Sequence, residues 1–153
     1  MIFSKILKNK SFLVYGLGLT GISAIKFLKK IGVKKISIWD DNSERRKKFN
    51  LKYKEKNIKK KFFDVDYIVL SPGIDINKCK LKNYVKKNKR KIITDLDIFH
   101  LNNPKNLKIT ITGTNGKSTT AKLLFRILKD QNKDVKLIGN IGIPVLSLSL
   151  IHI

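Results

Sequence analysis

The 153-residue sequence predicts an α/β protein built around a parallel sheet. Short β-branched and apolar stretches alternate with amphipathic helical stretches, which is typical of parallel strands joined by crossover helices. Two glycine-rich loops, at residues 16–21 and 113–116, each connect such a strand to such a helix. With 42% hydrophobic residues, the chain can bury one good core, or one core and part of another.

The first part of the chain is expected to alternate between strands and helices. Strands are expected at residues 11–15, 35–39, 66–70 and 91–94, and helices at residues 22–31, 43–51, 81–88 and 95–100. Gly32 is expected to end the first of these helices, and Ser43 and Asp95 are expected to cap the second and the last. The lysine-rich stretch 53–63 is ambiguous, and a short strand at about residues 58–62 is one interpretation of it.

The stretch 101–106, which contains Asn-Asn-Pro, is the predicted boundary between two domains. The first domain would comprise residues 1–104, and residues 105–153 would be the incomplete start of a second α/β domain. The expected elements of this second unit are a strand at residues 108–112, a helix that begins at residue 117 and a strand at residues 135–138. The helix is indicated by apolar residues at helical spacing, namely Ala121, Leu124, Phe125 and Leu128.

The end of the sequence is unusual. Residues 148–153, Leu-Ser-Leu-Ile-His-Ile, are the in-frame reading of a common transposon-type sequencing adapter. We therefore expect that these residues are not native and that the sequence is a fragment of a longer gene.

The loop before residue 117 has the composition of a phosphate-binding loop. Gly113 and Gly116 can adopt positive φ or lie close to a phosphate, and the following helix points its positive end at the same place. Lys117 then offers an ammonium group to the β and γ phosphates, and Ser118 offers a hydroxyl to Mg²⁺. Ile111 stands where the longer G-x-x-x-x-G-K-[ST] pattern has its first glycine, so the loop has the shorter G-x-x-G-K-S form. A nucleoside triphosphate site is predicted, with an ordinary strand-turn-helix and a surface lysine as the alternative.

A second phosphate-binding pattern lies nearer the amino terminus. Gly16, Gly18 and Gly21 follow a strand and open a helix, and Asp40 lies 19 positions after Gly21, at the end of the next strand. The glycines permit a tight turn, close approach of a pyrophosphate and close helix–strand packing, while the aspartate can accept hydrogen bonds from a ribose or a base. Alone, this fingerprint favours a nicotinamide-dinucleotide-binding domain, regulatory or oxidoreductase, and a βαβ unit without a ligand is a further alternative.

The formal net charge of +23 is carried almost entirely by lysine. Arginine occurs only at positions 45, 46, 90 and 126, and the lysines are accompanied by abundant isoleucine and asparagine, which share A/T-rich codons. The lysine-rich stretches lack the interleaved aromatic residues of nucleic-acid-binding surfaces. Genome composition is a sufficient cause of the charge, so no nucleic-acid partner is expected, although a basic nucleic-acid-binding protein stays a third hypothesis.

The cysteine, the histidines and the apolar runs of the sequence give further information on the class of protein. Cys79 is alone, so the chain can form neither an internal disulfide nor a cysteine metal site. Neither a secretory signal nor a stretch that could span a bilayer is evident, since the longest apolar run, 141–153, is interrupted by Pro144. His100 and His152 have no evident partners for acid–base or metal chemistry. A cytoplasmic protein without membrane insertion is expected.

The two glycine-rich loops occur in one chain and in this order, and with them the sequence resembles the Mur ligases of peptidoglycan synthesis, in particular their D-glutamate-adding members. The resemblance runs from about residue 11 to residue 146, and its motifs are Gly16–Ser23, Ser71–Ile74, Thr112–Thr119 and Gly139–Gly142. The resemblance implies a Rossmann-like, UDP-binding, parallel-sheet domain followed by the truncated start of a P-loop α/β ATP-binding domain.

The resemblance also implies an activity, which is ATP-dependent ligation of D-glutamate to UDP-N-acetylmuramoyl-L-alanine through an acyl phosphate, by a cytoplasmic monomer. This fragment would be inactive alone. Lys117 would be the catalytic clamp on the transferred phosphoryl group, and Ser118 would bind Mg²⁺. ATP would be bound by Gly113, Thr114, Asn115, Gly116, Lys117, Ser118 and Thr119. The UDP substrate would be bound by Leu19, Thr20, Asp40, Asp41, Gly73 and Asn140, while Asn42 stands where the family often has an arginine.

Overall fold

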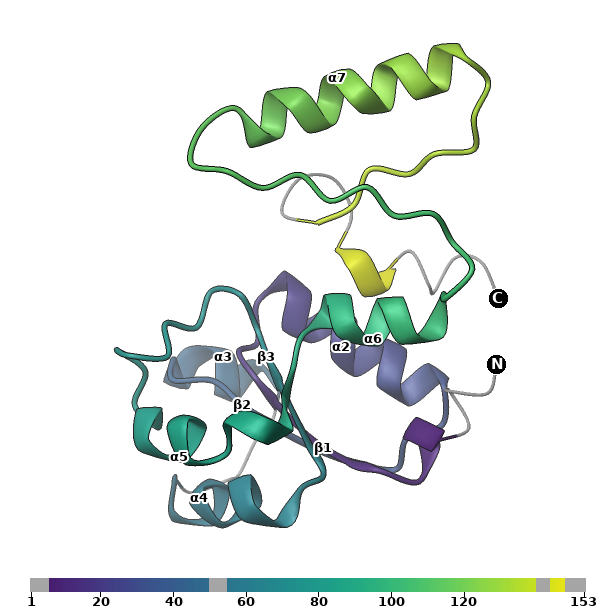
Figure 1. The fold of residues 1–153 in the computed structure, drawn as a ribbon. Coiled ribbons are helices and arrows are strands. Elements are labelled where there is room, and N and C mark those ends of the chain that lie inside the picture. The colour runs from purple at the N-terminus through teal and green to yellow at the C-terminus, as the bar shows by residue number, and fades with distance from the viewer. Residues whose placement is uncertain (1–5, 50–54, 140–143, 148–153) are drawn as a thin grey trace.

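A four-stranded parallel sheet forms the centre of the first domain (Figure 1). The structure, a computed structural model, describes residues 6–49, 55–139 and 144–147. The strands are β1 (Ser11–Tyr15), β2 (Lys35–Trp39), β3 (Tyr67–Leu70) and β4 (Ile92–Ile93), in the spatial order β2-β1-β3-β4. The α/β fold with a parallel sheet that the sequence predicts is therefore confirmed.

Helices cover both faces of this sheet. The helices of the first domain are α2 (Leu19–Lys30), α3 (Ser43–Lys48), α4 (Glu55–Asp64), α5 (Lys82–Lys87), the short 3₁₀ helix η1 (Lys89–Lys91) and α6 (Asp95–Asn102), and α7 (Lys117–Asp130) follows them in the chain. Residues of α2 and α6 pack on one face, and residues of α4 and α5 pack on the other (Figure 1). Among the described residues, no helix is both long and apolar enough to cross a bilayer.

The central strand β1 contributes to two cores. Phe12 and Val14 lie in the core beneath α2 and α6, whereas Leu13 and Tyr15 lie in the core beneath α4 and α5. All four side chains are fully buried. A parallel sheet covered on both faces needs such strands, because successive side chains point to opposite faces and neither face meets water.

Two of the predicted helix caps are wrong by one residue. The side chain of Asn42, not Ser43, caps α3 by accepting hydrogen bonds from the backbone N–H groups of Glu44 and Arg45. Thr94, not Asp95, caps α6, where Thr94 and Asp97 form a reciprocal capping box. Asn42 and Ser43 are both residue types that often cap helices, and so are Thr94 and Asp95. Residue type alone therefore does not show which member of each pair is the cap.

The strand considered at residues 58–62 is also wrong, because the segment is part of helix α4. Ile58 and Phe62 are both fully buried, in the core beneath α4 and α5. Residues four positions apart share one face of a helix. These two apolar residues therefore mark a helical face within a lysine-rich segment.

The strands expected at residues 108–112 and 135–138 do not form. Both segments lack strand structure, and only Ile138 makes an isolated bridge. The side chain of Leu107 is 92% exposed and that of Ile109 is 59% exposed. A strand needs a neighbour to pair with, and the described part of the chain places no strand beside residues 108–112.

Helix α7 forms as predicted but stands apart from the first domain (Figure 1). None of its residues is buried, and Leu123 and Ile127 are 59% and 45% exposed. The residues of its predicted apolar face, namely Ala121, Leu124, Phe125 and Leu128, are partly buried, so the helical pattern in the sequence marks the more protected side of the helix.

A short helical turn near the end of the described chain packs on the first domain. Val145 and Leu146 are buried in the core beneath α2 and α6, and the Ser147 hydroxyl lies 2.9 Å from that of Ser23 on α2. The domain boundary predicted at residue 104 falls just after the end of α6. The chain therefore leaves the first domain after α6 and contacts it again at residues 144–147. Asn140 and residues 148–153 lie outside the described residues.

Candidate functional site

The first glycine-rich loop lies at the carboxyl end of β1 and packs tightly against the end of β3. Gly16 has a φ of +105°, and its backbone N–H donates to the carbonyl oxygen of Trp39 over 2.8 Å. A Cβ on Gly16 would lie 2.7 Å from the Cβ of Ser71, and one on Gly21 would lie 1.8 Å from the Gly16 oxygen. Gly16 and Gly21 are therefore needed for packing of the loop itself.

Gly18 differs from these two glycines because the space in front of it is open. No atom lies within 4 Å of a Cβ built on Gly18. Helix α2 begins directly after it, without a side-chain cap and without an acidic residue in its first turn. Leu19 is 80% exposed and Thr20 is partly exposed at this positive helix end. Within the described residues, no side chain therefore caps the first backbone N–H groups of α2, which lie at the place where a pyrophosphate was predicted.

Asp40 is buried at the base of this loop. Its Oδ2 accepts a hydrogen bond of 2.6 Å from the backbone N–H of Leu17, and its Oδ1 accepts one of 2.8 Å from the backbone N–H of Asn42. The carboxylate therefore joins the loop after β1 to the turn after β2. Its predicted contact with a uridine stays a prediction, and the structure assigns it a positioning role in addition.

Asp41 connects three segments of the first domain. Its Oδ1 accepts hydrogen bonds from the Tyr15 hydroxyl over 2.8 Å and from Trp39 Nε1 over 3.2 Å. Its Oδ2 accepts one from the backbone N–H of Lys80 over 2.8 Å. Burial, and then the hydrogen bond to Asp41, raise the pKa of Tyr15 well above its usual value, so this hydroxyl stays a donor. The predicted uridine contact of Asp41 is likewise untested.

Sequence reasoning did not assign roles to several residues around this acidic pair. Tyr15 and Trp39 are the last residues of β1 and β2, and that position beside the loop is the signal that could have identified them. Arg46 Nη1 donates to the carbonyl oxygen of Asp40 over 2.6 Å, and its guanidinium carbon lies 4.4 Å from the centre of the Trp39 ring. These contacts hold the turn after β2 in place.

Gly73 follows β3 at the same edge of the sheet. It is exposed, and no atom lies within 4 Å of a Cβ built on it. This open space fits the expected passage of a ligand close to the backbone. The neighbouring Ser71, to which no role was assigned, donates its hydroxyl hydrogen bond to the Gly16 oxygen over 2.9 Å.

The second glycine-rich loop leads into α7. Gly113 and Gly116 have φ values of +146° and +74°, which is the positive φ that the sequence allowed for them, and Gly116 is the residue before the helix. No side chain caps α7, so its first N–H groups are directed toward the loop. The ammonium group of Lys117 turns back and donates to the carbonyl oxygens of Gly113 and, over 2.9 Å, of Thr114. The loop residues, Asn115, Ser118 and Thr119 included, are exposed.

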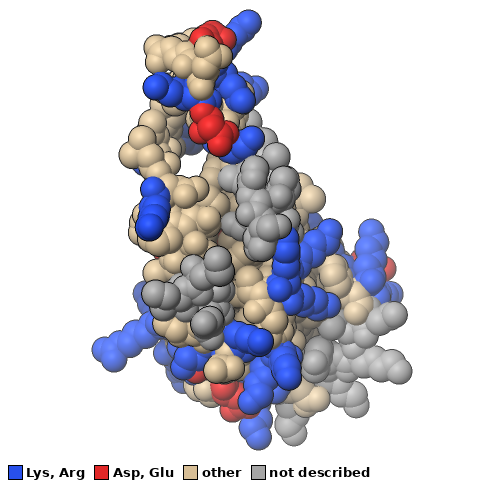
Figure 2. All heavy atoms as spheres, turned by 90° about the vertical axis from the view of Figure 1, so that its right-hand side faces the viewer, with Lys and Arg blue, Asp and Glu red and all other residues tan. Residues whose placement is uncertain are grey.

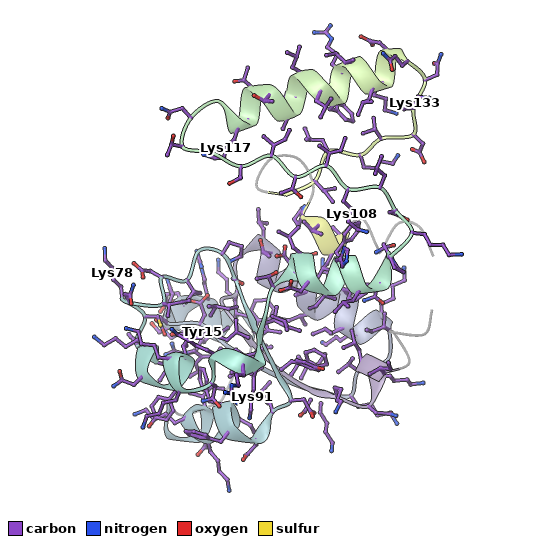
Figure 3. The ribbon with its side chains drawn as sticks, in the orientation of Figure 1. Tyr15, Lys78, Lys91, Lys108, Lys117 and Lys133 are labelled. Carbon is purple, nitrogen blue, oxygen red and sulfur yellow. The ribbon has the colours of Figure 1, made fainter. Side chains whose placement is uncertain are left out.

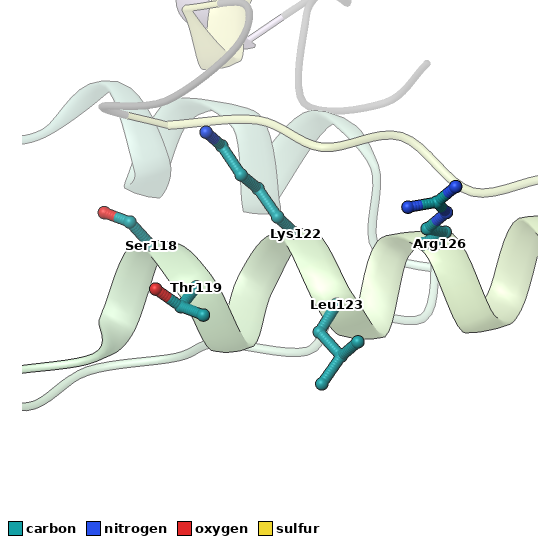
Figure 4. A pocket seen from close by; sticks show the side chains of 5 residues that line it. All are labelled: Ser118, Thr119, Lys122, Leu123 and Arg126. Atoms are coloured by element: carbon teal, nitrogen blue, oxygen red, sulfur yellow. The ribbon is translucent and has the colours of Figure 1, made fainter.

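A shallow hollow of about 310 Å³ lies along α7 beside this loop (Figure 4). Its lining residues are Ser118, Thr119, Lys122, Leu123 and Arg126. The described residues contain no cluster of three or more His, Cys, Asp or Glu side chains that could hold a metal ion. Mg²⁺ usually keeps several waters and binds through few protein ligands together with phosphates. The Ser118 hydroxyl is exposed at the start of α7, and its binding of a phosphate-bound Mg²⁺ stays a prediction.

The two glycine-rich loops are separate in the structure. Lys117 lies at the start of α7, whereas Tyr15 lies within the first domain at the end of β1 (Figure 3). On the face drawn in Figure 2, Lys and Arg side chains are spread from the part that carries α7 to the lower end of the first domain, with uncharged surface between them. The structure thus contains two glycine-rich loops on different elements.

Comparison with known proteins gives the family. The model of the "Mur ligase MurD-like, N-terminal domain" family matches residues 10–93. A UDP-N-acetylmuramoylalanine–D-glutamate ligase of Wolbachia sp. subsp. Brugia malayi is 41% identical over 149 residues, which cover 92% of this chain and 30% of that protein. The ligase of the same name from Clostridioides difficile is 40% identical over 153 residues, and covers 92% of this chain and 33% of that protein.

The chain therefore spans about a third of the length of the relatives it matches. The family match covers the four strands, both acidic residues after β2 and the first glycine-rich loop. The match and the arrangement of these parts lead to one conclusion: the chain belongs to the Mur ligase family, with a MurD-like N-terminal domain.

Proposed function

We propose that this chain provides the UDP-substrate domain and the ATP loop of a ligase that joins D-glutamate to UDP-N-acetylmuramoyl-L-alanine in peptidoglycan precursor synthesis. The observation that supports this most is the family match over residues 10–93, which includes the open loop at Gly18. The relatives that carry the name of this ligase extend the similarity to 92% of the chain. A cytoplasmic, monomeric enzyme is part of the proposal.

The UDP substrate would bind at the carboxyl edge of the sheet. Leu19 and Thr20 would offer the first backbone N–H groups of α2 to the pyrophosphate. Asp40 and Asp41 lie beside them at the end of β2, and Gly73 follows β3. Ligands of open parallel sheets bind in this position, outside the carboxyl ends of the strands.

ATP would bind at residues 113–119. The positive φ values of Gly113 and Gly116 and the uncapped start of α7 fit an anion, and Lys117 is close enough to bond the loop itself. Bound Mg²⁺ would neutralise phosphate charge, with Ser118 as its ligand from this chain. To reach ATP, the Lys117 ammonium would leave the carbonyl oxygens of Gly113 and Thr114 and bind phosphate oxygens instead.

The proposed reaction explains why one enzyme needs two phosphate-binding loops. A carboxylate is a poor electrophile, so the alanyl carboxylate would first take the γ-phosphoryl group of ATP and release ADP. The amine of D-glutamate would then attack the acyl phosphate and release inorganic phosphate. Lys117 would hold the transferred group in line and stabilise its charge, which are the main contributions of a protein to phosphoryl transfer.

Titration calorimetry of the 153-residue chain tests this proposal. The chain is titrated with UDP-N-acetylmuramoyl-L-alanine, with NADH and with duplex DNA at moderate salt. We expect binding of the UDP-sugar alone. Tight binding of NADH without the UDP-sugar would support the dinucleotide alternative, which the glycine fingerprint with Asp40 also allows. Binding of DNA alone would support a nucleic-acid-binding protein, and either outcome overturns the proposal.

A further inference from the structure

The first glycine-rich loop has no cationic side chain of its own to balance the negative charge of a diphosphate ligand. Residues 16–21 contain no lysine or arginine, and the buried carboxylate of Asp40 adds negative charge at their base. The end of α2 offers only the partial charge of its dipole. A cation from another element would help to balance both Asp40 and a bound diphosphate.

Arg45 on α3 has the right position. Its Nη1 lies 3.5 Å from Asp40 Oδ2, the same oxygen that accepts the hydrogen bond from the backbone N–H of Leu17. One carboxylate oxygen thus connects the guanidinium to the glycine-rich loop. The side chain of Arg45 is 54% exposed while that of Asp40 is 4% exposed, so the cation lies on the solvent side of the buried acid.

Arg45 also has guanidinium N–H donors that are available to a ligand. Within the part of the chain that the structure describes, Asp40 is the only polar partner of its guanidinium, and a guanidinium has five N–H donors. The next residue, Arg46, is already committed to two backbone carbonyl oxygens and the face of Trp39. Lys47 is committed to Glu44, 2.8 Å away.

We infer that Arg45 is a binding residue for the diphosphate of the UDP-linked substrate, held beside the glycine-rich loop by Asp40. This inference rests on the proposed function. A planar guanidinium can bind one acid and still donate to phosphate oxygens, which a single ammonium does less well. Asp40 then serves two purposes, since it fixes Leu17 in the loop and orients the cation.

The test is titration calorimetry of the 153-residue chain with UDP and with uridine, for the parent and for Arg45→Ala, Arg45→Lys and Lys47→Ala. Lys47→Ala is the matched control because it removes one positive charge from the same exposed helix. We expect Arg45→Ala to weaken UDP binding about tenfold and uridine binding less than about twofold. Arg45→Lys should restore part of the loss, and Lys47→Ala should bind UDP like the parent. Far-UV circular dichroism and thermal melting check that each variant is folded.

The outcomes separate this inference from the proposed function. If the parent binds UDP and Arg45→Ala binds it equally well, the inference is wrong and the proposed function stands. An equal loss in Lys47→Ala, or an equal loss for uridine, also overturns it, because the effect would then be one of net charge or of the nucleoside. A folded parent that binds neither UDP nor the UDP-sugar overturns the proposed function, and the inference with it.

Discussion

The hydroxyl of Ser71 donates to the carbonyl oxygen of Gly16 over 2.9 Å, and that Gly16 oxygen would lie 1.8 Å from a Cβ on Gly21. The end of β3 thereby holds the glycine-rich loop in place. Two of the three glycines in the fingerprint are required by this packing, and the third, Gly18, faces open space. The roles of packing and ligand binding can therefore be separated by mutation.

Gly21→Ala is expected to destabilise the chain, whereas Gly18→Ala is not. The new Cβ at position 21 would lie 1.8 Å from a backbone oxygen, which cannot move aside as a flexible side chain could. We expect a loss of about 3 kcal/mol or more in the free energy of unfolding for Gly21→Ala. Gly18 has a φ of −76° and open space, so its variant should unfold like the parent. Urea denaturation followed by circular dichroism measures both.

The Gly18→Ala variant also tests the ligand site. In the folded Gly18→Ala variant the new methyl group would lie where the pyrophosphate is proposed to approach the backbone, so UDP binding should fall at least about tenfold. Unchanged UDP affinity in this variant would contradict the proposed position of the pyrophosphate.

Lys117→Ala is expected to abolish acyl-phosphate formation in the complete enzyme while UDP-sugar binding stays nearly intact. The reason is that Lys117 lies at the start of α7, apart from the first domain (Figure 3). Trapping of the acyl phosphate and calorimetry with the UDP-sugar measure the two effects. Lys129→Ala, in the last turn of α7 and away from the loop, is the control. Retained turnover in Lys117→Ala would show that the clamp is misassigned.

Leu146→Ala is expected to destabilise the first domain although residue 146 lies far beyond its predicted boundary. Leu146 is fully buried in the core beneath α2 and α6, so truncation should cost about 2–5 kcal/mol. The control is Leu123→Ala on α7, where the side chain is 59% exposed and the change should stay within about 0.5 kcal/mol. Equal, small effects of both variants in urea denaturation would mean that residues 144–147 do not pack on this core.

Acidification is expected to weaken the hydrogen bonds that Ser11 donates to the carboxylate of Asp66. The backbone N–H and hydroxyl of Ser11, with a smaller contribution from Lys10, lower the pKa of Asp66 from 3.8 to about 2. Because the folded value lies below the unfolded one, this stabilisation is present above about pH 4 and is lost as the pH falls toward 2. Asp66 is partly exposed, so solvent screening keeps the effect small.

Thermal melting between pH 2 and pH 6 measures this effect. The parent should lose more stability over the acidic range than Asp66→Asn does. Asp130→Asn, at the exposed end of α7, is the control and should follow the parent. A parent and an Asp66→Asn variant with the same acid profile would contradict the prediction.

Most of the first domain could be predicted because its strands are short apolar runs with clear ends. The strands at residues 11–15 and 35–39 have the predicted bounds, since Gly16 and Asp40 follow them directly. Helix α4 could not be recognised from its lysine-rich composition, because among its described side chains only Ile58 and Phe62 are buried. The strand expected at residues 108–112 had the right composition, but strand structure also depends on a partner that composition does not specify.

The glycines of both loops could be predicted because each conformation requires a specific residue type. Gly16, Gly113 and Gly116 all have positive φ values. The contacts of Asp41 with Tyr15 and of Asp40 with Leu17 could not be predicted, because they depend on which strands become neighbours. A pattern in the sequence indicates the kind of loop, whereas the order β2-β1-β3 decides which side chains surround it.

The burial of Val145 and Leu146 in the first core has a consequence during protein synthesis. The hydroxyl groups of Ser23 and Ser147 that meet in the folded chain are 124 positions apart. Helix α6, which contributes to the same core, ends at Asn102, and Leu146 lies 44 positions further along. At ribosomal rates of about 5–20 residues per second, the core beneath α2 and α6 therefore waits roughly 2 to 9 seconds for its last residues. During that interval the nascent domain presents uncovered apolar surface, which is the surface that chaperones bind and through which unfinished chains aggregate.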